Sequence, residues 1–270
     1  MKIQMVAIDL DGTLLNSAKQ ITQATSAILR DVRAMGVHIV LASARPPRSV
    51  MPFYTLLDLD TPMINYNGAL VYDPSTQHVL MHRPIPADVA ALIVQRARKL
   101  APDVLVSAEI LDKWYTDRID GAYQTETARH CQPDVMAPVE EWLNQSITKL
   151  LLLGEADLLT GLRLDLEKAY PHQVTMVQTE GFLLQIMHAT TSKAAALRAV
   201  AAEMHVDREQ VMAIGDNAND VGMLQWAGIG VAMANASPDA LAVADYVTDH
   251  HNADGAAKAI HKIIIQGKVK

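Results

Sequence analysis

The chain has 270 residues, half of them apolar, and a formal net charge of −7, so it can form one large domain or two unequal ones. The acidic balance argues against nucleic acid or an anionic membrane as a partner, and no uncharged apolar stretch reaches the roughly 18 residues of a membrane span. The single cysteine excludes an internal disulfide framework, and the amino terminus lacks a signal-peptide pattern. These features predict a cytoplasmic protein and leave its oligomeric state open.

Strands and helices are predicted to alternate over the first 80 residues and again after Thr191, which is the pattern of an α/β fold with a parallel sheet. In the first stretch we expect strands at 3–8, 37–42 and 62–65, helices at 22–35 and 48–57, and a hairpin formed by 70–72 and 78–81. In the second we expect strands at 210–214 and 229–233 and helices at 192–204, 217–226, 238–243 and 254–265. One parallel sheet built from both stretches is the simplest arrangement.

Strands and helices do not alternate regularly in the segment between these two stretches, where prolines separate the elements and strands follow one another more often. We expect helices at 87–100 and 156–169 and strands at 103–109, 147–153, 173–179 and 182–187. This composition predicts a separate α+β module inserted into the sheet. Within it, Trp114, Tyr115, Arg118 and His130 could contact a ligand, although Trp and Tyr at such positions also serve as core.

The most informative motif is Asp9-Leu10-Asp11, which directly follows the first apolar strand and precedes Gly12 and Thr13. Side chains alternate along a strand, so the two carboxylates point into one site. Gly12 lets the chain leave the sheet, and the Thr13 hydroxyl can anchor the following loop. Two such charges repel unless a cation or a proton lies between them, and Mg²⁺ with a nucleophilic carboxylate is one solution. The alternative is a turn in which the acids only cap the backbone.

A second acidic group, Gly215-Asp216-Asn217-Ala218-Asn219-Asp220, again follows an apolar strand and opens a helix. Asp216 could provide a further oxygen ligand, and Asn219 or Asp220 could hold a metal-bound water, although a glycine turn with Asn and Asp caps is the alternative. The Ser43 hydroxyl could donate to an anionic oxygen or cap a helix. Lys193 could neutralise an anion beside Asp9 or be an ordinary surface lysine.

These four motifs, in this order, resemble those of the haloacid dehalogenase-like phosphatases, and the resemblance spans nearly the whole chain. Asn67-Gly68-Ala69, the stretch Val231–Ala236 and the long insertion resemble the Cof-type branch of that superfamily, which carries a large α/β cap. The resemblance implies a Rossmann-like parallel-sheet catalytic core formed by residues 1–83 and 187–270. It also implies an inserted α+β cap domain at residues 84–186.

The roles that the resemblance implies fall on matching positions of this chain. Asp9 would be the nucleophile that forms an aspartyl-phosphate, and Asp11 would protonate the leaving alcohol and later deprotonate the water. Mg²⁺ would be held by Asp9, the main-chain carbonyl of Asp11 and Asp216. The phosphoryl oxygens would be bound by Ser43, Lys193 and Asn219. Asn219 and Asp220 would support the metal shell, and Arg45 and Asn67 would be further supporting residues.

Two departures from the family pattern concern the loop after the second strand and the lysine motif. The chain has Ser43-Ala44-Arg45 where the family usually has Thr-Gly-Arg, and alanine adopts a positive φ less readily than glycine. Ala194 replaces a glycine often found after the motif lysine. Arg45 could contact substrate or brace its loop. His250-His251 resembles a metal site, but adjacent histidines seldom converge, and a solvated loop is the better interpretation.

The predicted function is therefore a Mg²⁺-dependent phosphatase acting on a small phosphorylated metabolite such as a sugar phosphate, pyridoxal phosphate or flavin mononucleotide. A dehalogenase is disfavoured, because Asp11 and Asp216 would have no purpose there. A phosphomutase on the same core shares the first steps and stays open. A non-catalytic phospho-ligand sensor is a further alternative, although a sensor does not need the nucleophile Asp9.

Overall fold

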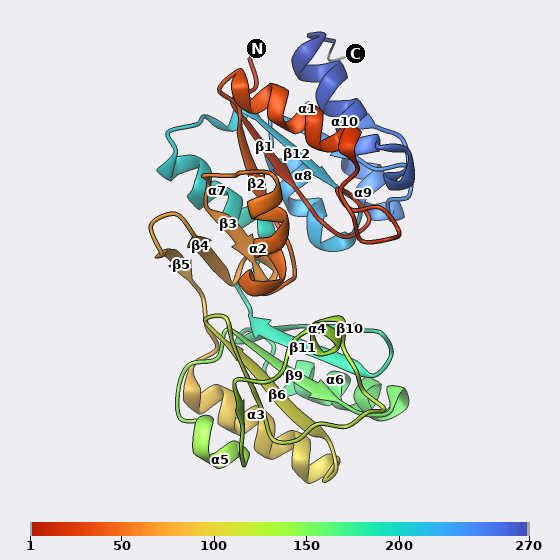
Figure 1. Ribbon diagram of the computed structural model, residues 1–270. Coiled ribbons are helices and arrows are strands. Elements are labelled where there is room, and N and C mark those ends of the chain that lie inside the picture. Colours follow the sequence, from red (N-terminus) through yellow and green to blue (C-terminus); the bar gives the residue numbers. More distant parts are fainter. Residues whose placement is uncertain (1, 269–270) are drawn as a thin grey trace. The chain divides into compact units, whose positions relative to one another are not determined.

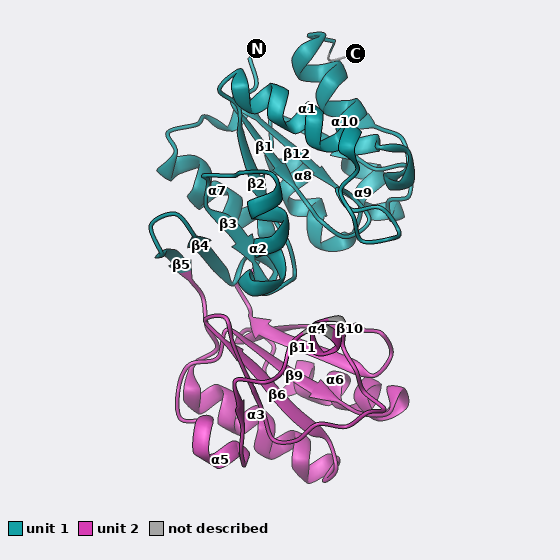
Figure 2. Cartoon of the chain, in the orientation of Figure 1, with its two compact units in different colours: residues 1–81, 192–270 teal, residues 82–191 magenta. Residues whose placement is uncertain are grey.

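The computed structural model describes residues 2–268, without the side chains of Glu126 and His130. The chain divides into two compact units, one formed by residues 1–81 and 192–270 and the other by residues 82–191 (Figure 2). Over the described residues, no helix is both long enough and apolar enough to cross a membrane. We call these the first unit and the second unit and describe each separately.

The first unit is built on a five-stranded parallel sheet with the strand order β14-β13-β12-β1-β2 (Figure 1). Its strands are β1 (Met5–Ile8), β2 (His38–Leu41), β12 (Val211–Gly215), β13 (Ile229–Ala232) and β14 (Tyr246–Val247). The central strand β1 pairs in register with β2 on one side and with β12 on the other. The predicted α/β class with a parallel sheet is thus confirmed, and the chain on both sides of the second unit contributes to that sheet.

Side-chain alternation along β1 explains why helices cover both faces of this sheet. Val6 and Ile8 belong to a core that includes side chains of α1 (Gln23–Ala34) and α10 (Gly255–Ile260). Met5 and Ala7 belong to a different core, formed with α7 (Lys193–Glu203) and α8 (Val221–Trp226). Asp9 continues the odd-numbered series, so the strand period directs it toward the face covered by α7.

The remaining helices of the first unit lie close to their predicted positions. Thr22 caps α1 as expected, since its side chain accepts a hydrogen bond from the Thr25 backbone N–H, and α9 spans Pro238–Val243. The last predicted helix is α10 followed by a π-helical turn at His261–Ile265. The other elements are α2 (Pro47–Leu56), with short 3-10 turns at Tyr66–Gly68, Arg208–Gln210, Ala218–Asp220 and His251–Ala253.

One strand departs from the single parallel sheet that the sequence predicted. Strand β3 (Met63–Asn65) belongs to a small three-stranded sheet with β4 (Leu70–Asp73) and β5 (His78–His82), in the order β3-β4-β5. It meets the end of β2 through an isolated parallel bridge between Ala42 and Ile64. The chain turns back within five residues of β3, so β3 pairs antiparallel with β4. The parallel sheet therefore ends at β2.

The second unit contains a six-stranded sheet with the order β10-β11-β9-β6-β7-β8, in which every pair except β7 with β8 is antiparallel. Its main elements match the predicted α+β pattern: α3 (Ala87–Leu100), β6 (Leu105–Ile110), β9 (Lys149–Leu153), α6 (Ala156–Ala169), β10 (Val174–Thr179) and β11 (Leu183–His188). Four short elements were not predicted, because they are too brief for a clear period: β7 (Lys113–Thr116), α4 (Glu126–His130), β8 (Val135–Met136) and α5 (Val139–Trp142).

Candidate active site

The centre of the candidate site is an ion-pair network around Lys193, which opens α7 and is fully buried. Its ammonium lies 2.5 Å from Asp9 Oδ1 and 2.6 Å from Asp220 Oδ1. Asp9 reaches it from the end of β1, where its backbone N–H donates to the Ile214 carbonyl of β12. A lysine is buried at such a position only when carboxylates pair with it, so the surface-lysine alternative is excluded.

Three carboxylates gather beside this single ammonium, because oxygens of Asp9, Asp216 and Asp220 all lie within 4.8 Å of one another. Burial raises the pKa of Asp9, the negative charges of Asp220 and Asp216 raise it further, and Lys193 only partly opposes them. Burial also raises the pKa of Asp216 to about 6, with Asp220 contributing and a Thr13 hydrogen bond opposing. One ammonium cannot balance two buried carboxylates and a third that is half-buried, so the group carries an excess of negative charge that a cation would neutralise.

Burial and hydrogen bonds distinguish the carboxylates that could coordinate an ion from one that could only support them. Asp220 is fully buried, and its Oδ1 accepts from Lys193 while its Oδ2 accepts from the backbone N–H groups of Asp216 and Asn217, at 3.0 and 3.1 Å. Asp220 is thus enclosed by the protein, with three hydrogen bonds to its two oxygens. Asp216 is only half-buried, and among the described residues the Asp9 side chain has one hydrogen-bond partner, Lys193, so these two carboxylates could coordinate an ion, and such hard oxygen donors suit Mg²⁺.

Three neighbours hold Asp216 against the turn that follows β1. Thr13 Oγ1 donates to Asp216 Oδ1 at 3.0 Å, so the hydroxyl expected to anchor its own loop instead orients a carboxylate. Gly12 has a φ of +81°, and a Cβ placed there would lie 2.3 Å from Asp216 Oδ2, so only glycine permits this approach. Asn235 Nδ2 donates to the Gly12 carbonyl at 2.8 Å and lies 3.5 Å from Asp216 Oδ2. Asn235 lies in the stretch Val231–Ala236 that resembles the Cof-type branch, but the sequence did not predict this role for it.

Asp11 occupies a different environment from Asp9, although two residues separate them. Arg45 donates from Nε to Asp11 Oδ2 at 2.7 Å and from Nη2 to Oδ1 at 2.6 Å, and Lys19 Nζ lies 2.6 Å from Oδ1. Burial raises the pKa of Asp11, but the hydrogen bonds from Arg45 and Lys19 outweigh it, so its pKa is lowered. The sequence did not indicate Lys19, because a lysine in a polar loop is an ordinary surface residue.

The loop after β2 brings Ser43 beside the end of β1. The Ala42 N–H donates to the Ile8 carbonyl, and buried Ser43 accepts a 3.1 Å hydrogen bond at Oγ from the Arg45 N–H. Ser43 thus holds its own loop, and a hydroxyl that accepts one hydrogen bond still has a hydrogen to donate. The backbone at Ala44 does not adopt a positive φ, so alanine in place of glycine introduces no strain there.

A left-handed turn joins this loop to the second acidic group. Tyr66, Asn67 and Gly68 have φ values of +50°, +57° and +95°, which are costly for Tyr and Asn. The Asn67 N–H donates to the Ser43 carbonyl at 3.0 Å, and Asn219 Nδ2 donates to Asn67 Oδ1 at 2.9 Å. Asn219 is therefore held by Asn67, not by Asp216, and it lies at an exposed position.

Other residues that the sequence singled out have structural partners instead. The rings of His250 and His251 lie 4.2 Å apart, and His251 Nε2 contacts Ser17 Oγ rather than the acidic group. In the second unit, Trp114 Nε1 donates to Ser107 Oγ, Tyr115 packs against Trp142, and Arg118 lies 3.3 Å from Asp117. The side chain of His130 lies outside the described residues.

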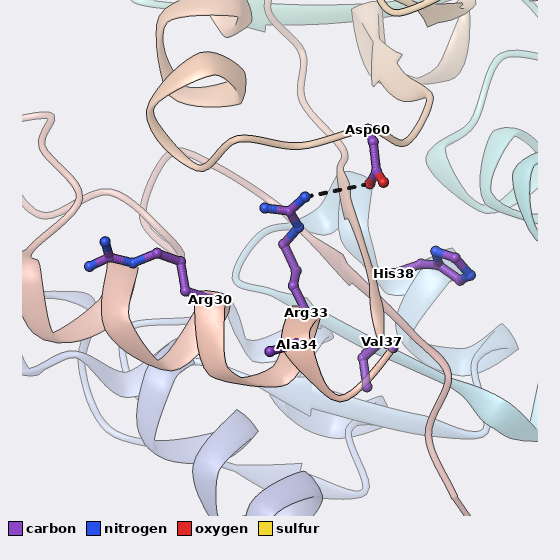
Figure 3. A pocket seen from close by; sticks show the side chains of 7 residues that line it. Arg30, Arg33, Ala34, Val37, His38 and Asp60 are labelled. Atoms are coloured by element: carbon purple, nitrogen blue, oxygen red, sulfur yellow. Dashed lines mark ion pairs between the residues drawn. The ribbon is translucent and has the colours of Figure 1, made fainter.

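A pocket of about 400 Å³ lies at the opposite ends of the strands, where β2 begins. It is lined by Arg30, Arg33, Ala34, Gly36, Val37, His38 and Asp60. Figure 3 shows Arg33 pointing toward Asp60, at 3.8 Å, while Arg30 and His38 point away from them. Its charged side chains do not converge on one point, and ligands of open α/β sheets bind at the carboxyl ends of strands. The candidate site is therefore the group formed by Asp9, Asp216 and Asp220.

Comparisons with known proteins show which family this chain is similar to. A family model described as haloacid dehalogenase-like hydrolase matches residues 6–260. The Bacillus subtilis protein YxeH is 32% identical over 273 residues, which cover 97% of this chain and 98% of YxeH. The Bacillus subtilis 5-amino-6-(5-phospho-D-ribitylamino)uracil phosphatase YitU is 27% identical, with 95% of this chain and 96% of YitU covered.

Solved structures agree over the same length. A haloacid dehalogenase-like hydrolase from Bacteroides thetaiotaomicron superposes with a TM-score of 0.88 at 26% identity, covering 97% of this chain and all of its own. A phosphatase of the same superfamily, also from Bacteroides thetaiotaomicron, gives a TM-score of 0.80 at 26% identity, with 96% and 94% of the two chains covered. The likeness thus spans both units.

Proposed function

This chain belongs to the haloacid dehalogenase-like hydrolase family and is a phosphatase, and we propose that it hydrolyses small-molecule phosphate monoesters with Mg²⁺ through an aspartyl-phosphate. The observation that carries the proposal is the convergence of Asp9, Asp216 and Asp220 around buried Lys193. Phosphate-monoester hydrolysis is among the slowest uncatalysed reactions, with enzymatic accelerations of up to about 10²¹-fold. A site with a nucleophile, a cation-binding pair and a buried ammonium supplies the kinds of groups that such a reaction needs.

Asp9 is the proposed nucleophile. Its Oδ1 is held by Lys193 at 2.5 Å, which fixes the orientation of the carboxylate and leaves Oδ2 to attack phosphorus. The ammonium also offsets repulsion between the carboxylate and an incoming phosphate dianion. Asp220 holds the same ammonium from the other side, so Lys193 cannot turn away from Asp9.

Asp11 is the proposed acid and base. It lies beyond the end of β1, half-exposed, where a leaving alcohol and a water molecule can reach it. It would donate a proton to the departing alcohol oxygen when the Asp9–phosphorus bond forms. It would then accept a proton from the water that attacks the aspartyl-phosphate.

Mg²⁺ would be held by Asp9, the main-chain carbonyl of Asp11 and Asp216. The clustered carboxylates and the raised pKa of Asp216 support a cation at this position. When bound, Mg²⁺ neutralises charge on Asp9 and on the phosphoryl oxygens. Asp220 would act through Lys193 and the backbone rather than as a ligand, because both its oxygens already accept hydrogen bonds.

The phosphoryl oxygens would be held by Ser43, Lys193 and Asn219. Ser43 has a hydroxyl hydrogen to donate, and Lys193 carries the buried positive charge. Asn219 is oriented by Asn67, so Asn67 would support phosphate binding indirectly. Arg45 would brace Asp11, which is the contact that it makes in the first unit.

We further propose that residues 1–83 and 187–270 form the catalytic core and residues 84–186 form the cap domain of this family, acting in the cytoplasm on a small phosphorylated metabolite. Two relatives are named as 5-amino-6-(5-phospho-D-ribitylamino)uracil phosphatases, which supports that compound and phosphorylated sugar alcohols as members of a substrate panel. Sugar phosphates, pyridoxal phosphate and flavin mononucleotide complete that panel.

The test follows phosphate release from para-nitrophenyl phosphate, with Mg²⁺ and with excess chelator, and then from the metabolite panel. The proposal expects turnover that requires Mg²⁺ and is lost with the chelator. Binding of panel members without turnover would favour the sensor. Transfer of phosphate from one panel member to another hydroxyl, without release, would favour the mutase.

A further inference from the structure

Two cationic groups contact the Asp11 carboxylate, the guanidinium of Arg45 and the ammonium of Lys19. Arg45 forms a two-pronged contact with both carboxylate oxygens, and Lys19 adds a third contact at Oδ1. We infer that Lys19 is a positioning residue, which together with Arg45 holds the Asp11 carboxyl in the orientation from which it protonates the leaving oxygen. This inference rests on the proposed function, in which Asp11 is the acid.

The loop that carries Lys19 is rigid by its own hydrogen bonds. Asn16 Oδ1 accepts from the backbone N–H groups of Ala18 and Gln20, each at 3.0 Å. Lys19 has a φ of +58°, and its N–H donates to the Asn16 carbonyl at 2.9 Å. A lysine in the left-handed region persists only where its surroundings determine it, so the backbone at residue 19 is held in one place.

A distant part of the chain clamps the same loop. The Ser17 N–H donates to Asn252 Oδ1 at 2.8 Å, and Asn252 Nδ2 donates back to Ser17 Oγ at 2.8 Å. His251 Nε2 lies 3.2 Å from the same hydroxyl, and the His251 N–H donates to Asn235, which binds Gly12 beside the acidic group. The support of the Lys19 loop is therefore continuous with the support of the metal-binding carboxylates.

The two Asp11 oxygens differ in their contacts. Among the described residues, Oδ1 accepts from both Arg45 and Lys19, whereas Oδ2 accepts from Arg45. Oδ2 is thus the oxygen with the most remaining capacity for another partner. Arg45 and Lys19 keep Asp11 ionised in the free protein, so it must first take up a proton from solvent once the phosphate dianion is bound. In the first step, the Asp9 carboxylate then forms a bond to phosphorus, the bond from phosphorus to the alcohol oxygen breaks, and that proton passes from Asp11 Oδ2 to the alcohol oxygen.

The alternative is that Lys19 and Asp11 form an ordinary exposed ion pair that has no effect on proton transfer. The side chains of Lys19 and Asp11 are 50% and 39% exposed, and pairs of this kind usually contribute little to stability. A positioning role is distinguished by the reaction step that it affects. Proton donation matters most for a basic leaving group and hardly at all for a leaving group that departs readily as an anion.

The experiment compares Lys19→Met with the wild-type enzyme on phenyl phosphate and para-nitrophenyl phosphate, measuring kcat/KM for each with Mg²⁺ present. The two substrates are nearly the same size, but phenolate is a much more basic leaving group than para-nitrophenolate. We expect kcat/KM to fall about tenfold for phenyl phosphate and less than about twofold for para-nitrophenyl phosphate. Lys19→Arg, which keeps the cation, should restore most of the loss.

The matched control is Lys258→Met, which removes the ammonium of another exposed ion pair, with Asp249, in the same unit. It should leave both kcat/KM values unchanged. An equal loss on both substrates after Lys19→Met, or no loss on either, would overturn the positioning role. Failure of the proposed function is a separate result, because it would appear as absent Mg²⁺-dependent turnover of para-nitrophenyl phosphate by the wild-type enzyme.

Discussion

Asp9 and Asp11 come from one short motif, yet the structure gives them opposite surroundings. The Asp9 side chain is 9% exposed and shares one ammonium with another buried carboxylate, whereas the Asp11 side chain is 39% exposed and meets two cations. Burial and neighbouring carboxylates raise the pKa of Asp9 in the metal-free protein. Hydrogen bonds from Arg45 and Lys19 overcome the effect of burial and lower the pKa of Asp11.

Under the proposed function, this contrast would let one strand end supply two different chemical roles. Environment, rather than residue type, separates paired carboxylates into distinct functions. The raised pKa of Asp9 reflects an excess of negative charge that a bound cation would relieve. Asp11 instead has compensating positive charge from the protein itself, which favours the ionised form that accepts a proton.

Asp9→Asn should lower turnover of para-nitrophenyl phosphate by about 10⁴-fold or more, because an amide oxygen is a poor nucleophile. The fold should persist, since Lys193 keeps its second partner, Asp220. The measurements are phosphate release with Mg²⁺ and the thermal midpoint without it. Asp165→Asn, which removes a carboxylate from an ion pair of the second unit, serves as the control. A folded Asp9→Asn enzyme with nearly normal turnover would remove Asp9 from the role of nucleophile.

Lys193→Met should destabilise the metal-free protein by about 3–5 kcal/mol at pH 8, because it strands two buried carboxylates without their cation. The loss should be smaller at pH 5, where protonation of Asp9 removes part of the repulsion. Urea unfolding at the two pH values measures both effects. Lys258→Met should cost less than about 1 kcal/mol. A similarly small cost for Lys193→Met would mean that the buried carboxylates do not depend on this ammonium.

Residue position in the chain explains which parts of this site were predictable. Asp9 and Asp216 each follow an apolar strand, and neighbouring parallel strands bring their carboxyl ends to one edge, so sequence alone predicted that they meet. Lys19 lies in a loop without a period or a motif, and its contact with Asp11 depends on how that loop folds back. Asn235 lies in a stretch that resembles the Cof-type branch, but its contact with Gly12 joins loops more than 200 residues apart, and no local pattern predicts such packing.

The fold shows the same division between periodic and irregular segments. Long amphipathic helices such as α3 and α6 were predicted with their observed bounds, because their period extends over 14 residues. Strand β3 was expected in the parallel sheet, and it does lie parallel to the end of β2, but only through the single Ala42–Ile64 bridge. Its main partner is β4, into which the left-handed turn at Tyr66–Gly68 returns the chain. A positive φ at a tyrosine is not predictable from propensity, since it is imposed by the contacts around it.

The affinity for Mg²⁺ should rise with pH between about 5 and 8, because Asp9 and Asp216 must lose protons to bind it. Both pKa values are raised in the folded, metal-free protein, so protons bound to Asp9 and Asp216 stabilise the metal-free form at low pH. This stabilisation is lost as the pH rises toward 8. Apparent affinity should change by up to about tenfold per pH unit for each proton displaced. Titration calorimetry in buffers of different ionisation heat measures both affinity and proton release.

Asp216→Asn is the matched variant for this titration. It should weaken Mg²⁺ binding and reduce the number of protons released, because one of the two titrating ligands is then neutral. An affinity that is independent of pH in the wild-type protein would contradict a metal site built from these carboxylates.

The smallest predicted effect concerns Ala44. It lies between Ser43, which the loop brings beside the end of β1, and Arg45, which binds Asp11. The backbone there does not have a positive φ, so glycine would relieve no strain and would only add freedom to the unfolded chain. Ala44→Gly should therefore cost about 0.4–1 kcal/mol in urea unfolding. Turnover should stay within about twofold, because the Ser43 hydroxyl still holds the Arg45 N–H. A gain in stability or activity would mean that alanine strains this loop and that glycine improves the placement of both side chains.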